Sequence, residues 1–286
     1  MVDALASASA HWLERDTLVV RGADARSWLD GLVTCAVSQV QVGAGAYGLL
    51  LTKQGKIVSD VWLLFSADAA LYVGVAPGLG EPVQALLDRY LVMEDAELSQ
   101  SPALSWRLAA RGGVLPPAGE LATGDVALGS VSFVAQVGSA DSSALPRASD
   151  LLAEFGFGAY GVDFSERDNP HEASLDRVAV SWTKGCYLGQ EVVCMQDMRG
   201  KVKRRLTALA ADDALVDLHA NAIAAGPVPV LDAVGAPVGH VTSAHRAASG
   251  ALLLASVATS ALEGQPELSV LGRKVRLAAS SADDAR

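Results

Sequence analysis

Two β-favouring segments joined by a short glycine turn constrain the fold of this chain more than any other feature of its sequence. Residues 47–52 and 57–65 flank the tetrapeptide Lys53-Gln54-Gly55-Lys56. Gly55 can take the positive φ of a tight turn, so the pattern predicts a β-hairpin. A further strand expected at residues 70–75 follows closely, and the resulting sheet is expected to be antiparallel.

Hydrophobic periodicity predicts further helices and strands around the hairpin. Apolar positions three and four residues apart predict helices over residues 24–33, 80–91 and 148–155. Runs of β-favouring residues predict strands over residues 17–21, 104–110 and 131–137, the last two separated by the Pro116-Pro117 loop and glycine-rich turns. This order of elements favours an α+β fold with mostly antiparallel sheets.

The pattern changes after residue 205 to short strands separated by turns. The turns lie at Gly226-Pro227, Gly235-Ala236-Pro237 and Glu263-Gly264-Gln265-Pro266, a spacing that suits a small β-barrel or sandwich. The chain has 286 residues, more than the roughly 150 of one average domain. We therefore expect a boundary near Arg205, with one region over residues 1–205 and a small β domain over residues 206–280.

Bulk properties exclude several classes of protein. Apolar residues make up 51% of the chain, yet no apolar run reaches the roughly 18 to 20 residues that span a bilayer, so we expect no membrane association. The net charge of −10 argues against a general DNA-binding surface. Without an export signal, Cys35, Cys186 and Cys194 are expected to be reduced thiols of a cytoplasmic protein.

One short basic stretch departs from the acidic average. It could receive an anionic ligand or an RNA backbone, or it could be a charged, solvated strand edge that prevents aggregation. The stretch consists of Arg199, Lys201, Lys203, Arg204 and Arg205.

Common nucleotide, metal and hydrolase motifs do not explain the chain. The glycines of residues 43–48 have dinucleotide-binding spacing, but a strand rather than a helix is expected to follow them. Gly55-Lys56 lacks the rest of a phosphate-binding loop. Neither the histidines nor the cysteines have the spacing of a closed zinc or iron–sulfur site, so we expect no metal held by this chain alone.

Two features remain as candidates for chemistry. The octapeptide Lys184-Gly185-Cys186-Tyr187-Leu188-Gly189-Gln190-Glu191 places a cysteine between glycines and near a lysine, a setting that can lower a thiol pKa, although a buried structural cysteine fits the same pattern. Asp60 lies inside the apolar strand 57–65. It is expected to be either a half-buried functional carboxylate or an edge residue that faces solvent.

The same octapeptide resembles the signature of the YgfZ family, folate-binding relatives of the glycine-cleavage T-protein that assist iron–sulfur enzymes. The order of surrounding segments is similar too: Arg21-Gly22-Ala23-Asp24-Ala25, the Gly55-Lys56 turn before Asp60, the basic residues up to Arg205, and Gly235 to Ser243 in the C-terminal part. The resemblance thus covers nearly the whole chain. It implies a T-protein-like fold of two interleaved antiparallel sheet-and-helix subdomains followed by a small C-terminal β-barrel.

A second resemblance, to the T-protein itself, lies at Tyr160-Gly161-Val162-Asp163 and at Pro170-His171-Glu172-Ala173-Ser174-Leu175. It implies a pocket for tetrahydrofolate, or a one-carbon derivative of it, between the subdomains and the barrel. The family resemblance makes Cys186 the reactive thiol and Asp60 a second catalytic candidate. The residues expected to bind the cofactor are Asp60, Glu172, Lys184, Tyr187, Gln190 and Glu191, with Lys184 also tuning the thiol.

Three functions follow from these expectations. The leading one is a folate-binding accessory protein that supports iron–sulfur cluster assembly or repair, in contact with iron–sulfur client or assembly proteins, with an effect on iron–sulfur-dependent tRNA modification. One alternative is a folate-dependent aminomethyltransferase or another one-carbon transferase, although the Thr-Gly-Glu segment with which T-proteins read the pterin is missing between Gly129 and Pro146. The other is a non-catalytic module that binds RNA or protein through the basic stretch.

Overall fold

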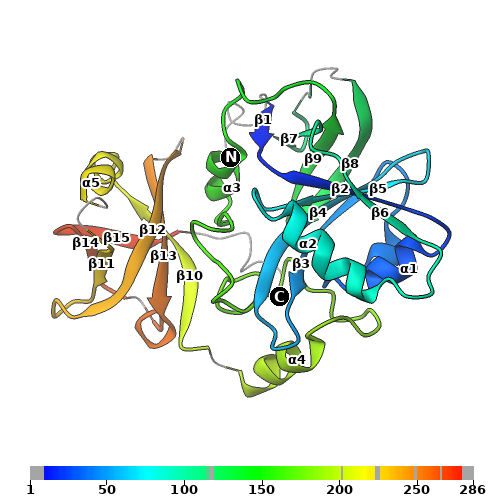
Figure 1. Ribbon diagram of the computed structural model, residues 1–286. Coiled ribbons are helices and arrows are strands. Elements are labelled where there is room, and N and C mark those ends of the chain that lie inside the picture. The colour runs from blue at the N-terminus through cyan, green and yellow to red at the C-terminus, as the bar shows by residue number, and fades with distance from the viewer. Residues whose placement is uncertain are drawn as a thin grey trace.

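A computed structural model describes residues 10–113, 115, 119–200, 202–222, 226–247, 250–264 and 266–278 (Figure 1). The chain forms two antiparallel sheets, a closed antiparallel barrel and five described α-helices. The first sheet has the strand order β3-β4-β5-β2-β6, and the second has the order β1-β7-β9-β8. The barrel has the order β10-β13-β12-β11-β14-β15.

The two sheets are interleaved in the sequence. The four-stranded sheet takes β1 (His11–Leu13) and later β7 (Ser105–Ala110), β8 (Glu120–Leu128) and β9 (Val131–Gly138). The five-stranded sheet takes everything between, namely β2 (Asp16–Arg21), β3 (Gly45–Leu51), β4 (Ile57–Phe65), β5 (Leu71–Val75) and β6 (Glu97–Gln100). The predicted α+β fold of two interleaved subdomains followed by a barrel is therefore confirmed.

The predicted hairpin is β3 and β4, paired from Gly45 with Leu64 to Leu51 with Ile57. Strand β4 lies between β3 and β5, and both of its faces are covered. Trp62 and Leu64 point into a core shared with the four-stranded sheet, whereas Val61 and Leu63 point into a core beneath helices α1 (Ala25–Asp30) and α2 (Gly80–Leu87). This double burial explains why the strand is nearly continuously apolar.

The predicted helices are present but shorter than expected. Helix α1 ends at Asp30, and α2 passes at Leu87 into the 3₁₀ turn Asp88–Tyr90. Helix α3 (Ala148–Glu154) lies between the four-stranded sheet and the barrel and contacts strands of both. Strand β8 was not expected, because residues 120–128 were assigned to the turns between two predicted strands.

The barrel begins at Arg204. Its strands are β10 (Arg204–Ala211), β11 (Val228–Leu231), β12 (Pro237–Ala247), β13 (Gly250–Ala258), β14 (Leu268–Val270) and β15 (Arg273–Leu277). Helix α5 (Ala214–Ala222) packs on β12 and β13, and a separate apolar core that includes Leu253 and Val257 fills the interior. Helix α4 (Gln190–Arg199) and the chain between residues 159 and 189 connect the sheets to this barrel (Figure 1).

Candidate functional site

A cavity of about 340 Å³ lies where the segment 161–172 meets the barrel. Strands β10, β12 and β13 supply its barrel side, and the green segment between the sheets and the barrel in Figure 1 supplies the other. Its lining is mostly polar and consists of Gly161, Val162, Asp163, Phe164, Ser165, Arg167, Asp168, Glu172, Leu206, His240, Thr242 and Ser256. Its size lies at the lower end of the range for small-molecule sites, roughly 300 to 1,000 Å³.

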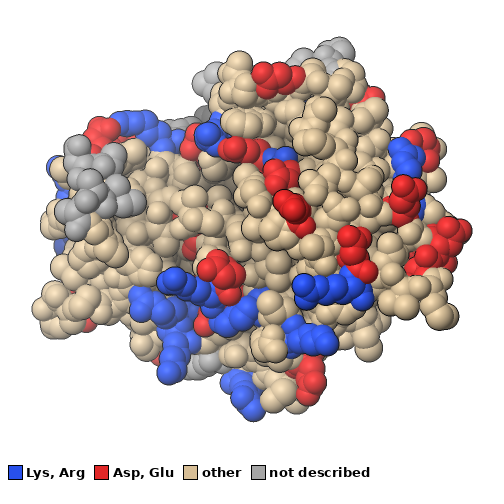
Figure 2. Space-filling model, in the orientation of Figure 1, with Lys and Arg blue, Asp and Glu red and all other residues tan. Residues whose placement is uncertain are grey.

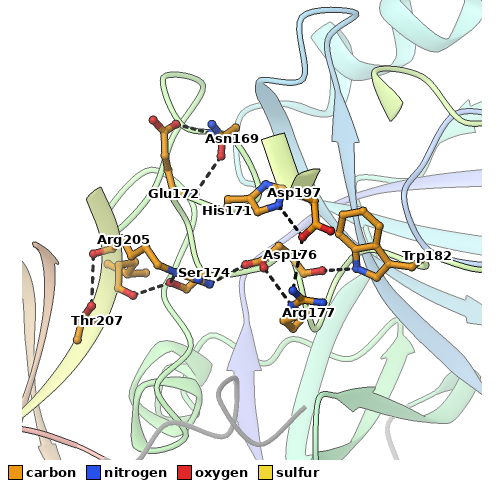
Figure 3. Close-up of polar contacts among 11 residues, drawn as sticks. Asn169, His171, Glu172, Ser174, Asp176, Arg177, Trp182, Asp197, Arg205 and Thr207 are labelled. Atoms are coloured by element: carbon orange, nitrogen blue, oxygen red, sulfur yellow. Dashed lines mark hydrogen bonds and ion pairs between the residues drawn. The ribbon is translucent and has the colours of Figure 1, made fainter. Parts of the chain in front are cut away.

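Glu172 lines this cavity and is held by a reciprocal pair of hydrogen bonds with Asn169. The Asn169 backbone N–H donates to Glu172 Oε2 over 2.9 Å, and the Glu172 N–H donates to Asn169 Oδ1 over 2.9 Å (Figure 3). The Lys56 ammonium also lies 3.1 Å from Oε2. Among the described residues, no hydrogen bond to Glu172 Oε1 is formed, so this oxygen keeps its accepting capacity.

Asp163 anchors the segment to the barrel. Its Oδ1 accepts hydrogen bonds from the hydroxyls of Thr242 and Ser243, each over 2.6 Å, and its Oδ2 accepts one from the Ala159 N–H over 2.9 Å. Asp163 is 8% exposed. These three donors use the carboxylate of Asp163 within the protein, so Asp163 has a structural role and holds the cavity wall in place.

Three further groups, Asp168, His240 and Arg167, give the cavity a mixed electrostatic character. Asp168 accepts hydrogen bonds on Oδ2 from the N–H and hydroxyl of Ser165, which leaves Oδ1 without a hydrogen bond among the described residues. Burial, followed by the nearby Arg204 charge, lowers the pKa of His240, so this imidazole is neutral at pH 7. Arg167 is exposed at the rim and supplies a positive charge.

Asp60 does not line this cavity. It is 2% exposed, and its carboxylate accepts two hydrogen bonds from the Arg15 guanidinium, over 2.6 and 2.8 Å. The Tyr47 hydroxyl donates to Oδ2 over 3.3 Å, and burial together with the Asp60 charge raises the pKa of Tyr47. Both expectations for its exposure are wrong, because β4 is a central strand and Asp60 points between the two sheets.

Lys184 was expected to act on the neighbouring Cys186, but its side chain is directed at the end of helix α1. Its side chain is 2% exposed, and its ammonium donates to the carbonyl oxygens of Asp30, Val33 and Cys35 over 2.5, 3.0 and 2.8 Å. Burial lowers the pKa of this ammonium, and the nearby Asp30 carboxylate opposes that effect. Lys184 thus satisfies carbonyls at the end of α1, and its described hydrogen bonds do not reach Cys186.

The three cysteines differ sharply in environment. Cys186 is exposed, Cys194 is partly buried and Cys35 is buried. Burial raises the pKa of the Cys35 thiol to about 12, the Lys184 charge opposing it. The octapeptide therefore carries the one exposed thiol among the described residues.

The rest of the octapeptide leads into α4. Tyr187 is 6% exposed, its ring lies 5.7 Å from the Lys184 ammonium, and burial raises the pKa of its hydroxyl. Gln190 and Glu191 form the first turn of α4, Gln190 half-buried and Glu191 exposed. Of the residues predicted to bind a cofactor, Glu172 alone lines the described cavity.

The hairpin tip connects the octapeptide with the cavity. Gly189 has φ of +83°, and a Cβ placed on it would lie 2.5 Å from the Thr52 carbonyl oxygen. A Cβ on Gly55 would lie 3.0 Å from the Val192 side chain. The neighbouring Lys56 binds Glu172, so the hairpin turn contacts both the octapeptide segment and the lining of the cavity.

A largely buried polar cluster that the sequence did not reveal lies to the right of Glu172 in Figure 3. One imidazole nitrogen of His171 and one carboxylate oxygen each of Asp176 and Asp197 lie within 4.8 Å of one another. Arg177 contacts both carboxylates, and Arg205 contacts Asp176 over 2.8 Å. Spacing arguments missed it because the three groups come from a turn and from α4, and two of them are carboxylates.

The predicted basic stretch is partly used within the protein. Arg205 binds the buried Asp176, and Arg204 donates to the Ser256 carbonyl oxygen over 3.3 Å. Lys201 lies outside the described residues. Basic side chains nevertheless gather at the lower edge of the face in Figure 2, where α4 and the start of β10 lie in Figure 1. None of the described helices has the length and apolar run needed to cross a membrane.

Comparison with known proteins identifies the fold. Residues 15–105 match the family described as the GCVT N-terminal domain. The crystal structure of glycine cleavage system aminomethyltransferase T from Bartonella henselae is similar with a TM-score of 0.71 and 14% sequence identity, over 98% of this chain and 88% of that chain. No curated protein matches the chain in sequence. The chain therefore has the fold of the T-protein-like superfamily.

Proposed function

We propose that this protein binds a tetrahydrofolate, or a one-carbon derivative of it, in the cavity between segment 161–172 and the barrel. The observation that carries the proposal is the position of this cavity in a T-protein-like fold, together with its lining residue Glu172, whose Oε1 accepts no hydrogen bond among the described residues. A pterin presents an amino group and a ring N–H as adjacent donors. A carboxylate oxygen without a partner is the acceptor that such donors need.

The other lining groups suit the rest of a folate. Asp168 offers a second carboxylate oxygen, the neutral His240 can accept or donate, and Arg167 can pair with the glutamate carboxylates at the rim. The donor set therefore fits the ligand. When bound, the folate would supply a one-carbon unit or its carrier nitrogen, and these residues would orient the pterin and exclude water from it.

We further propose that the protein acts as an accessory to iron–sulfur proteins. The chain has three cysteines, and Cys35 is buried with a pKa of about 12. Clusters are usually held by four cysteine thiolates, so a role that uses the exposed Cys186 in contact with a client suits this chain better than resident cluster binding. The support for the iron–sulfur connection itself is the resemblance of the octapeptide to the YgfZ signature.

A folate-dependent aminomethyltransferase is the second candidate, since the fold is compatible with it. That reaction would use Asp60 to exchange a proton with the folate nitrogen. Both oxygens of Asp60 already accept hydrogen bonds from Arg15, and the side chain is 2% exposed. A transferase mechanism would first have to break this pair, so we rank the accessory role above it.

A module that binds RNA through the basic stretch is a weaker candidate. Arg204 and Arg205 are engaged with the barrel and with Asp176. RNA binding would weaken steeply with added salt and would need no folate. Folate-independent binding of this kind would favour the module.

Calorimetric titration with tetrahydrofolate tests the cavity. We expect saturable one-to-one binding, weakened roughly tenfold by Glu172→Gln because the neutral amide is a poorer acceptor of the pterin N–H groups. Glu120→Gln, at the exposed start of β8, is the matched control and should bind as the wild type does. Absence of saturation at high micromolar ligand would reject the site.

Complementation of cells that lack the protein tests the accessory role. Cys186→Ser should fail to restore the activity of iron–sulfur enzymes, whereas Cys194→Ser should restore it. Full restoration by Cys186→Ser would reject a function for the thiol. Measured one-carbon transfer from an aminomethyl donor would instead establish the transferase.

A further inference from the structure

The His171 side chain is buried, and no hydrogen bond to it is formed by the residues that the structure describes. The residue is 7% exposed, and neither ring nitrogen has a hydrogen-bond partner among the described residues. Nε2 points toward Asp197 Oδ1 at 3.5 Å (Figure 3). Buried polar groups in proteins are nearly always satisfied, so this imidazole requires an explanation.

Two carboxylates converge on the same point. Asp176 is 2% exposed, and the ligating atoms of His171, Asp176 and Asp197 lie within 4.8 Å of one another. Nitrogen and oxygen ligands of one transition-metal ion lie roughly 3 to 4 Å apart, given bond lengths of about 2.1 Å. Small side-chain movements would therefore bring all three groups to a common ion.

We propose that His171, Asp176 and Asp197 form a binding site for a divalent transition-metal ion such as Zn²⁺. One imidazole and two carboxylates favour such an ion over Mg²⁺ or Ca²⁺, which prefer all-oxygen sites. Three protein ligands leave at least one coordination position for water or another ligand. The site is separate from the proposed folate cavity, since none of its three residues lines that cavity.

Arg177 places a positive charge against the same two carboxylates and would compete with a metal ion for them. Its guanidinium lies 3.4 Å from Asp176 Oδ2 and 3.5 Å from Asp197 Oδ1, longer than the 2.7 to 2.9 Å of strong charge-assisted hydrogen bonds. Its side chain is 47% exposed, so it can turn into solvent when an ion enters. Asp197 has 35% of its side chain exposed, so an ion could reach the site from solvent at this residue.

Arg205 has a different role at the same site. It binds Asp176 Oδ1 over 2.8 Å, so in the proposed site Oδ2, which lies 3.4 Å from Arg177, would be the oxygen that ligates the ion. Such outer contacts orient metal-ligating carboxylates. A bound ion would fasten α4, which carries Asp197, to the turn that carries His171 and Asp176, and so would fix the helix that follows the octapeptide.

Calorimetry with Zn²⁺ on the metal-free, full-length chain tests this site through two opposite substitutions. Asp197→Asn removes a ligand and should weaken binding by roughly tenfold or more. Arg177→Gln removes the competing cation and should tighten binding by roughly tenfold. Asp212→Asn, which removes another exposed, ion-paired aspartate, is the control and should leave affinity unchanged.

Co²⁺ provides an independent readout of the ligands. The Trp182 ring lies 6.2 Å from the His171 ring, so bound Co²⁺ should quench its fluorescence, and Trp182→Phe should remove that quenching while binding persists. The absorption spectrum should lack thiolate-to-cobalt charge transfer. Failure of both the wild type and Arg177→Gln to bind would overturn the proposal, as would binding that survives Asp197→Asn or that disappears in Cys186→Ser.

Discussion

Arg15 and Asp60 form a two-pronged ion pair between the two sheets, with 7% and 2% of their side chains exposed. Arg15 lies in the short connection from β1 in one sheet to β2 in the other, and Asp60 lies on the central strand β4. The pair therefore joins the sheets at the place where the chain passes between them. Such a buried carboxylate is first a structural group, and any ligand contact would come at the expense of this pair.

Asp60→Asn is expected to lower the free energy of unfolding by roughly 3 kcal/mol, because it leaves the Arg15 charge buried without a counter-ion. Urea denaturation measures the loss. Asp68→Asn is the matched control: it breaks the Arg21–Asp68 pair, whose side chains are 48% and 57% exposed, and should cost less than about 1 kcal/mol. Equal losses in the two variants would contradict a structural role for the buried pair.

Lys184→Met should destabilise the fold without changing the reactivity of Cys186. Three carbonyl oxygens at residues 30, 33 and 35 would lose their shared donor, for an expected cost of roughly 2 to 3 kcal/mol. Denaturation gives the stability and timed alkylation gives the thiol rate. A large fall in the Cys186 rate at unchanged stability would restore the original hypothesis that Lys184 tunes the thiol.

Alkylation of the native protein near pH 7.5 should modify Cys186 first, Cys194 more slowly and Cys35 last. Exposure sets the first two ranks, and the pKa of about 12 keeps Cys35 a protonated thiol. Mass mapping after short exposure gives the order. Cys35 should react quickly only after denaturation, and its early modification in the native protein would conflict with the structure.

His219 should make the barrel region sensitive to acid. It is 6% exposed on α5, and burial, followed by repulsion from His245, lowers its pKa below 6.5. Since the unfolded chain takes up the proton at higher pH than the folded one, stability is greatest above about pH 6.5 and declines as the pH falls through the folded pKa. Between pH 7.5 and pH 5.5, the urea midpoint should fall less for His219→Leu than for the wild type. An equal fall in the two proteins would rule out a contribution of His219 to the acid sensitivity.

Local sequence patterns were sufficient to predict the hairpin and most of the strands of the two sheets. Alternation, turn glycines and apolar spacing are properties of neighbouring residues, and these predicted β3, β4 and β5 with small errors at the ends. Strand β8 was missed because a proline-rich loop precedes it and Gly124 interrupts its β-favouring character. Close packing of Gly124 on Ala44, which directly precedes β3, explains why a glycine stands there.

The partners of buried charges could not be predicted in this way. Lys184 binds carbonyls about 150 residues away in sequence, and Asp60 pairs with an arginine 45 positions earlier. Both contacts depend on how the sheets and turns assemble. The sequence left a buried structural cysteine open as the alternative at Cys186, and the structure shows the exposed thiol that the flanking glycines favour. The convergence of His171, Asp176 and Asp197 could not be predicted from local patterns.

The contact between the hairpin tip and the octapeptide limits what can be exchanged between homologous proteins. No side chain fits at Gly189 beside the Thr52 carbonyl, and any side chain added at Gly55 presses on Val192. A chimera that receives the octapeptide of a relative but keeps the original 53–56 turn would bring together two surfaces that do not match sterically. The two segments form a single transplantable unit, although some 130 residues of sequence separate them.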